Sequence, residues 1–194
     1  MAYISLGGGG KLTMKNSKII NNTVKDDGSA NTSSGGGISL ASQAYTAVIE
    51  DCEISGNKVD VSSKTASKPK VEGCGLYTGN DINSKTYIKG KTMIQGNSYI
   101  RHVSKNTYVE GIGMWMQGGE VTIGEDGKSD DESPIIQNHQ EGNANSVKGT
   151  AIYMEGSSKV YWKSGQITNN GGSANAIFKT GSSTLSNTSG NTAS

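Results

Sequence analysis

The stretch Gly111–Gly119 reads GIGMWMQGG, and it decides the fold of this 194-residue chain. Apolar and small residues alternate in it and glycines stand at both ends, which is the pattern of a short strand with one buried face. The same phrase recurs at Gly35–Leu40, Gly73–Thr78 and Gly149–Met154, with a spacing of 38 residues between copies. Further copies begin near residues 2 and 174. We therefore expect one repetitive domain over residues 1–194, with coils starting near residues 2, 35, 73, 111, 149 and 174.

Two more short elements follow each copy of this strand. One is a second strand, seen as Lys11–Met14, Ala47–Ile49, Thr86–Ile88, Val121–Ile123 and Val160–Trp162. The other has the form Ile-x-x-Asn and begins at Ile19, Ile54, Ile94, Ile135 and Ile167, each of which we expect to point inward. Three short strands per repeat predict an all-β, single-stranded parallel β-helix of about five to six coils.

Composition agrees with a narrow, shared core. The chain has 28 glycines and two prolines, and 32% of its residues are hydrophobic. Such a composition is also found in disordered chains, but the regular placement of Ile, Leu, Met and Val favours a solenoid in which each repeat buries a thin stripe.

Charge and hydropathy exclude several classes of protein. The net charge is +1, from 18 basic and 17 acidic residues, and no basic run suggests a nucleic-acid partner. No apolar run reaches 18 residues, so we expect no membrane insertion. Met1 is followed at once by strand-like sequence without a signal-peptide pattern. We expect either a protein that is not secreted by that route, or a mature or excised segment of a longer chain.

The repeat resembles those of bacterial right-handed parallel β-helix proteins, including the GGGIxV/ISGN-type repeats of surface proteins and adhesins. The residues that carry the resemblance are GGGISL at Gly35–Leu40, EISGN ending at Asn57, and KLTMKNSKIINN at Lys11–Asn22. The resemblance covers nearly the whole chain, and it implies a right-handed coil and a bacterial, extracellular or cell-surface location. Proteins of this kind serve as stalks and adhesins and, in some cases, as carbohydrate-active enzymes.

One outward column is aromatic. On the first strand of successive coils, the outward positions are Tyr77, Trp115, Tyr153 and Phe178. A flat exposed aromatic strip would suit sugar rings or a partner protein. Alternatively, the stacked rings stabilise the sheet or lie under a loop.

A second column is made of asparagines at the end of the Ile-x-x-Asn element: Asn22, Asn57, Asn97, Asn138 and Asn170. Side-chain amides at equivalent turns can hydrogen-bond from coil to coil, so we expect a structural ladder and not a ligand site. Cys52 and Cys74 fall on inward positions of different sheets, which predicts buried free thiols.

Charges on the second strand form two outward columns. One contains Lys11, Thr46, Lys85, Glu120 and Lys159, and the other contains Lys15, Glu50, Lys89, Gly124 and Lys163. Neighbouring coils often differ in sign, which favours the correct register, although a functional basic patch is an alternative.

An acidic insertion separates the second and third elements of one coil and reads GEDGKSDDESP. It is a weak candidate for a Ca²⁺ site formed by Asp126, Asp130, Asp131 and Glu132. The spacing fits no established calcium loop, which favours a solvated loop.

Long loops follow each asparagine, at Thr23–Ser34, Lys58–Glu72, Ser98–Glu110, His139–Lys148 and Gly171–Ser173. They leave from one corner of the coil and so form one ridge, a frequent binding face of solenoids.

The outward columns lack the carboxylate pair that acid–base catalysis requires, because Glu50 and Glu120 lie two coils apart in different columns. A catalytic site would have to come from loops, with Asp60, Asp81 and the acidic insertion. We therefore expect a non-catalytic structural or adhesive β-helix without a cofactor; the alternative is a carbohydrate-binding or polysaccharide-degrading protein, a lyase or hydrolase. Expected partners are a glycan, a surface protein, or further copies stacked end to end into filaments through uncapped coils.

Overall fold

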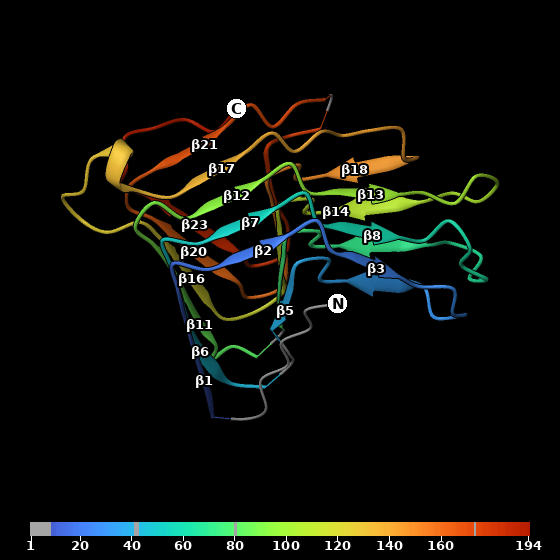
Figure 1. The fold of residues 1–194 in the computed structure, drawn as a ribbon, viewed down its shortest axis with the longest axis horizontal. Helices are drawn as coiled ribbons and strands as arrows, with labels where there is room; N and C mark the ends of the chain where they lie inside the picture. The colour runs from blue at the N-terminus through green and yellow to red at the C-terminus, as the bar shows by residue number, and fades with distance from the viewer. Residues whose placement is uncertain (1–8, 41–42, 80, 173) are drawn as a thin grey trace.

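The computed structural model describes residues 9–40, 43–79, 81–172 and 174–194, and these form an all-β solenoid of stacked parallel strands (Figure 1). The predicted fold class is confirmed. Within the described residues, the one helix is the short 3₁₀ segment η1 (Asp130–Glu132) in the acidic insertion. The expected first copy of the repeat, near residue 2, lies outside the described residues.

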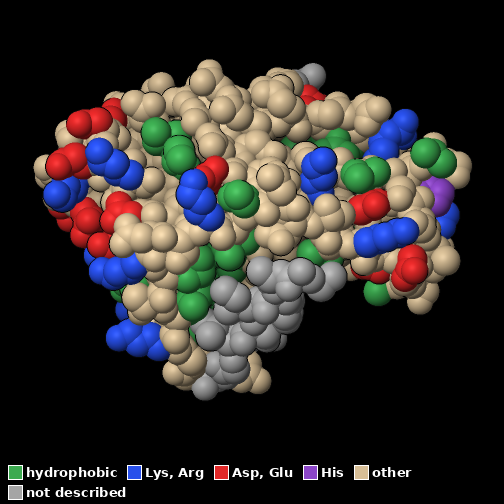
Figure 2. Space-filling view, in the orientation of Figure 1, with side chains coloured by type: hydrophobic (Ala, Val, Ile, Leu, Met, Phe, Trp, Pro, Cys, Tyr) green, Lys and Arg blue, Asp and Glu red, His purple; other side chains and the backbone are tan. Residues whose placement is uncertain are grey.

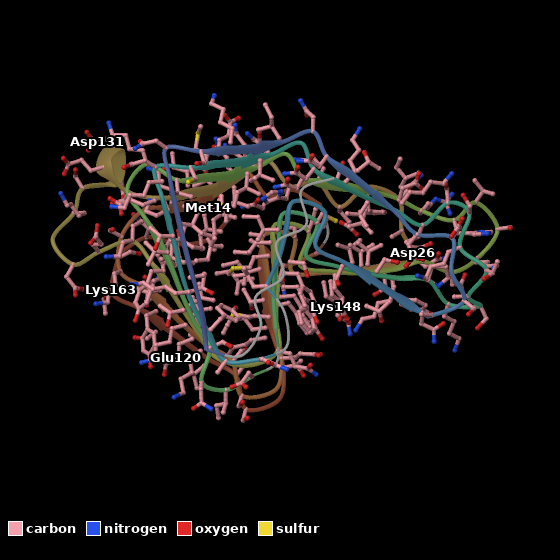
Figure 3. All side chains as sticks on the ribbon, turned by 60° about the horizontal axis from the view of Figure 1, so that its bottom comes forward. Met14, Asp26, Glu120, Asp131, Lys148 and Lys163 are labelled. Carbon is pink, nitrogen blue, oxygen red and sulfur yellow. The ribbon has the colours of Figure 1, made fainter. Side chains whose placement is uncertain are left out.

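Three parallel sheets surround the main core (Figure 3). The first sheet consists of β5 (Ile38–Leu40), β10 (Leu76–Thr78), β15 (Met114–Met116), β19 (Ile152–Met154) and β22 (Ile177–Lys179). The second sheet consists of β1 (Gly10–Lys15), β6 (Tyr45–Glu50), β11 (Lys85–Lys89), β16 (Glu120–Ile123), β20 (Lys159–Trp162) and β23 (Thr184–Asn187). The third sheet consists of β2 (Lys18–Ile20), β7 (Glu53–Ser55), β12 (Met93–Gln95), β17 (Ile135–Gln137) and β21 (Gln166–Thr168).

Side chains of alternating strand positions fill the space between these sheets. Ile38 pairs with Leu76, and Leu76 pairs with Met114, so residues at equivalent positions of successive coils stack directly on one another. All three are fully buried. In Figure 3, Met14 points from the second sheet into this interior. Each coil therefore buries a thin apolar layer against its neighbours, which explains how a chain with few hydrophobic residues builds a core.

One predicted inward residue is wrong by a single position. Ile136, not Ile135, pairs with Ile94 and is fully buried, whereas Ile135 pairs with Met93 and is partly exposed. A one-residue shift moves a side chain to the opposite face of a strand. The acidic insertion directly before β17 makes the two adjacent isoleucines indistinguishable by spacing.

The coil holds more than the three predicted strands, because the long loops form strands of their own. The fourth sheet consists of β3 (Thr23–Lys25), β8 (Lys58–Asp60) and β13 (Ser98–Ile100). The fifth sheet consists of β4 (Thr32–Ser34), β9 (Lys70–Glu72), β14 (Tyr108–Glu110) and β18 (Ser146–Lys148). Together they build a side lobe that extends away from the three-sheet core, on the right of Figure 1.

The side lobe has its own small core. Val59 of the fourth sheet, Val71 and Val109 of the fifth sheet, and Cys74 and Ile112 at the junction are all buried there. The predicted ridge of loops is thus a second stack of in-register strands, and its apolar lining explains why these loops keep a regular course.

Candidate functional site

The predicted aromatic column exists, but it is not a flat exposed strip. Tyr77 and Trp115 stack with ring centroids 4.7 Å apart and planes 3° apart, and Tyr153 and Phe178 stack at 5.5 Å and 2°. Trp115 is 2% exposed and Tyr153 is 3% exposed. Within each of these two pairs the ring faces lie against one another, which favours the structural interpretation of the column over a platform for sugar rings.

The aromatic column lies beside the junction of the first sheet and the side lobe, which we call the corner. Strands of the fifth sheet lead through a tight turn, at Gly73 or Gly111, into strands of the first sheet. At one end of the column, the Lys148 ammonium lies 5.3 Å from the centroid of the Phe178 ring. Figure 3 shows Lys148 in this corner. The fifth sheet thus places charged side chains beside the outward aromatic rings.

Two carboxylates and one lysine form a cluster in this corner. Glu72 and Glu110 occupy equivalent positions of adjacent strands, and the Lys70 ammonium contacts one oxygen of each, at 2.8 and 2.7 Å. The Glu72 and Glu110 side chains are 8% and 12% exposed. Like charges in register repel each other, so the shared lysine is what allows both strands to carry a glutamate.

Burial and the neighbouring charges shift the pKa values of this cluster. Burial raises the pKa of Glu72, against the stabilising effect of Lys70. Burial disfavours the charge on Lys70, but the ion pairs with Glu110 and Glu72 outweigh it and raise the pKa of Lys70. Burial also raises the pKa of Tyr153, and the negative charges of the nearby Glu110 and Glu155 carboxylates raise it further. Because the Lys70 ammonium binds both the Glu72 and the Glu110 carboxylate, the cluster links two neighbouring coils.

The sequence pattern did not predict the pairing of Glu72 with Glu110, because both residues stand at the ends of long loops. A signal was present: Lys70–Glu72, Tyr108–Glu110 and Ser146–Lys148 each read x-Val-charged, and successive copies are 38 residues apart. This is the spacing of the Gly-x-Gly strands that come directly after them.

The asparagine ladder forms, with one member different from the prediction. Asn22 donates through its side-chain amide to Asn57 Oδ1 at 3.0 Å, and Asn57 donates in the same way to Asn97 Oδ1 at 3.0 Å. Asn57, Asn97 and Asn170 also donate to main-chain oxygens of neighbouring coils. These bonds tie each corner to the coil beside it.

His139 holds the ladder position that the repeat predicts for Asn138. The backbone N–H of His139 donates to Asn170 Oδ1 at 3.3 Å, its Nε2 lies 3.1 Å from the Ile94 carbonyl oxygen, and the residue is fully buried. Burial lowers the pKa of His139 to about 4. Asn138 is exposed and has a φ of 59°, as Gly56 and Gly96 have φ values of 63° and 57° at the same corner. Its role is to form the left-handed turn, which asparagine tolerates better than most residues.

Close approach to this ladder explains the second glycine of the Gly-x-Gly phrase. A Cβ on Gly75 would lie 2.7 Å from Asn97 Nδ2, and a Cβ on Gly113 would lie 2.7 Å from His139 Nε2. A Cβ would also lie 2.6 Å (on Gly75) or 2.5 Å (on Gly113) from a main-chain oxygen of the next coil. These distances are too short for a side chain, so the two glycines make room for both the ladder and the neighbouring coil.

The four acidic residues of the insertion do not converge on a cation site. Asp126 pairs with Lys163 at 2.6 Å, Glu132 pairs with Lys128 at 3.8 Å, and Asp130 accepts hydrogen bonds from the side chain of Asn191. The last member, Asp131, is exposed. Among the described residues, no group of three or more His, Cys, Asp or Glu side chains is placed to hold a metal ion. The insertion carries exposed acidic side chains such as Asp126 and Glu132, and charged side chains crowd this end of the molecule in Figure 2.

The other loop carboxylates considered for catalysis lie at different corners of the coil. Asp60 ends β8 in the side lobe and accepts a hydrogen bond from the Ser62 backbone N–H at 2.9 Å. Asp81 lies between the first and second sheets and accepts from the Asn83 N–H at 2.8 Å. Each of these two carboxylates stabilises a turn by accepting a hydrogen bond from the backbone N–H two residues further along the chain. Cys52 and Cys74 are free and buried, as predicted.

Comparisons with known proteins give no identification. In the part of the chain that the structure describes, no helix is long and apolar enough to cross a membrane. No family model, no curated protein and no solved structure matches this chain.

Proposed function

We propose that this chain is a non-catalytic structural β-solenoid, a rigid module of a bacterial extracellular or cell-surface protein. The observation that supports the proposal is the in-register stacking of equivalent residues in all five sheets. Tyr77, for example, pairs with Trp115 in the first sheet, and Val71 pairs with Val109 in the side lobe. Side chains and backbone are thus used chiefly to hold neighbouring coils in one arrangement.

Ion pairs add to this coil-to-coil connection. Lys15 with Glu50, Lys18 with Glu53, and Glu120 with Lys159 each join strands of adjacent coils, at 2.8, 2.9 and 3.4 Å. Such exposed pairs contribute little stability each, but they disfavour a slipped register in which like charges would meet. A stalk or adhesive module needs this property, since its length and its displayed surface must stay fixed.

Immunogold labelling of intact source cells tests the proposed location. Antibodies raised against the purified chain should decorate the surface of intact cells, and protease treatment of those cells should remove the label. Labelling that requires permeabilised cells would contradict the proposal. As a matched check on the absence of catalysis, the purified chain should release no reducing ends from a panel of bacterial and host polysaccharides.

End-to-end assembly is a separate prediction. Among the described residues, β23 is the last strand in the order of the second sheet, and the edge of such a strand is where a further copy would add a strand of its own. Negative-stain electron microscopy over a concentration series should show rods if copies stack through such edges. Dispersed short particles at every concentration would contradict assembly, and they would leave the proposal of a structural module intact.

A further inference from the structure

The outer face of the second sheet carries a hollow that the structural role does not require. One outward column of this sheet runs through Tyr87 on β11, Thr122 on β16 and Tyr161 on β20. A neighbouring outward column runs through Lys89, Gly124 and Lys163, two residues further along the chain in each coil. In both columns the middle coil has a small residue between two large ones.

The result is a slot over β16. It has a volume of about 380 Å³ and is lined by Tyr87, Lys89, Thr122, Gly124, Glu125, Asp126 and Lys163. We call this hollow the β16 slot. The strands on its two sides lie two strand spacings apart, about 10 Å, which leaves room for one six-membered sugar ring above Thr122 and Gly124.

Backbone geometry fixes the floor of the β16 slot. Gly124 has a φ of 76°, and a Cβ there would lie 2.2 Å from Ser164 Oγ. No other residue fits this position without moving β20 or the turn after it. The chain then turns outward, and the Glu125 N–H donates to Ser164 Oγ at 3.0 Å, which holds the acidic loop at the rim.

The rim carries balanced charge. Lys89 Nζ lies 3.0 Å from Glu125 Oε1, and Lys163 Nζ lies 2.6 Å from Asp126 Oδ2. Both lysines and both carboxylates keep part of their surface exposed. Figure 3 shows Lys163 directed away from the core on this side of the molecule. The slot therefore offers donors and acceptors around an uncharged floor, beside the ring of Tyr87.

We propose that the β16 slot binds a neutral pyranose unit of a glycan. Lys89 Nζ lies 5.9 Å from the centroid of the Tyr87 ring. The apolar C–H face of the sugar would take its place against this ring, and the sugar hydroxyls would exchange hydrogen bonds with Thr122, the two lysines and the two carboxylates. A pyranose has both an apolar C–H face and hydroxyls that donate and accept, and the β16 slot offers an aromatic ring beside paired donors and acceptors. A negatively charged ligand is disfavoured, because it would have to displace Glu125 and Asp126 from their lysines. This inference does not depend on the structural role proposed above.

The test is a titration of the ¹⁵N-labelled chain with methyl glucoside, galactoside and mannoside, followed by NMR. At least one of them should shift the backbone amides of Thr122, Gly124 and Glu125, with a Kd of about 1 mM for so small a ligand. The variant Thr122→Tyr fills the slot with a ring that continues the column between Tyr87 and Tyr161. It should keep the fold and weaken binding at least tenfold.

Val48→Tyr is the matched control. Val48 lies in the same outward column, on the far side of Tyr87 from the β16 slot, so this variant adds the same ring outside the slot. It should bind the pyranoside as the unmodified chain does. The proposal is overturned if no pyranoside shifts the slot amides, or if Thr122→Tyr binds with unchanged affinity. It is likewise overturned if inorganic phosphate or methyl glucuronide binds more tightly than every neutral pyranoside, with an affinity that falls as salt is added.

Discussion

His139 stands in a column of asparagines, and we expect the variant His139→Asn to remove an acid sensitivity from the fold. The imidazole is fully buried, and its Nδ1 has no hydrogen-bond partner among the described residues. Burial lowers the pKa of His139 to about 4 because a charged imidazole would be taken out of water. Asparagine at this position would supply the side-chain amide that Asn97 and Asn170 use in the coils beside it.

The magnitude is set by the difference in pKa between the two states of the chain. In the unfolded chain the histidine has its ordinary pKa of 6.5, and in the folded chain the pKa is about 4. Between these pH values the unfolded state binds more protons, so the free energy of unfolding rises with pH. The contribution of His139 amounts to about 3 kcal/mol, which is lost as the pH falls from about 7 to about 4.

Urea unfolding of both proteins over this pH range measures the effect. Carboxylates titrate in the same range, so the quantity of interest is the difference in unfolding free energy between His139→Asn and the unmodified chain. This difference should shift by about 3 kcal/mol in favour of the variant between pH 7 and pH 4. His102→Asn removes a partly exposed imidazole from the side lobe and serves as the control. Parallel pH profiles for His139→Asn and the unmodified chain would refute the reasoning.

Two substitutions and one labelling experiment test the Lys70 cluster, the aromatic column and the side-lobe core. Lys70→Met leaves Glu72 and Glu110 in register without their shared cation, and it should lower the free energy of unfolding in urea by about 3 kcal/mol. Trp115→Ala removes a stacked ring that is 2% exposed, and it should cost about 3–5 kcal/mol in the same assay. Cys74 is fully buried, which raises the pKa of its thiol to about 12, so maleimide should label it only after unfolding.

Each of these outcomes has a defined contradiction. Lys163→Met removes a lysine whose partner Asp126 is 75% exposed, so it should change stability by less than about 1 kcal/mol. If Lys70→Met and Lys163→Met lowered the free energy of unfolding equally, burial of the Lys70, Glu72 and Glu110 cluster would add nothing to its contribution to stability. A Trp115→Ala variant with unchanged stability would show that the aromatic column is not a structural element. Labelling of Cys74 in the native protein at the rate of an exposed thiol would contradict the side-lobe core.

The fold was predictable because the solenoid repeats its residue choices at a fixed spacing. Apolar residues of equivalent strands pair in register, as Ile38, Leu76 and Met114 do, so alignment of the repeats alone identifies the buried face. The side lobe was harder to predict. Its strands are three residues long and lie within loops of different lengths, so a strand such as Lys70–Glu72 shows only one apolar residue, Val71, and no alternation. In the fifth sheet the signal lies only in the 38-residue spacing between equivalent strands of successive coils.

The sites were less predictable for two physical reasons. An insertion of variable length hides the register of the next strand and turn, so spacing pointed to Asn138 in place of His139 and to Ile135 in place of Ile136. The exposure of a side chain also depends on which other part of the same chain packs against it. The Trp115 and Tyr153 rings point away from the main core, as predicted, yet they are buried where the side lobe meets the first sheet. A pattern of alternation shows which way a side chain points, but it does not show what lies opposite.

The distance between spin labels on the third sheet tests the central claim of a rigid, in-register stack most directly. Lys18 and Gln166 occupy the same outward column of this sheet, on its first and last strands. Labels at Lys18→Cys and Gln166→Cys should give a narrow distance distribution in pulsed electron paramagnetic resonance. Its centre should lie at about 20 Å, since four strand spacings separate the two positions. A broad distribution, or one centred well beyond about 30 Å, would contradict the stack and the structural role built on it.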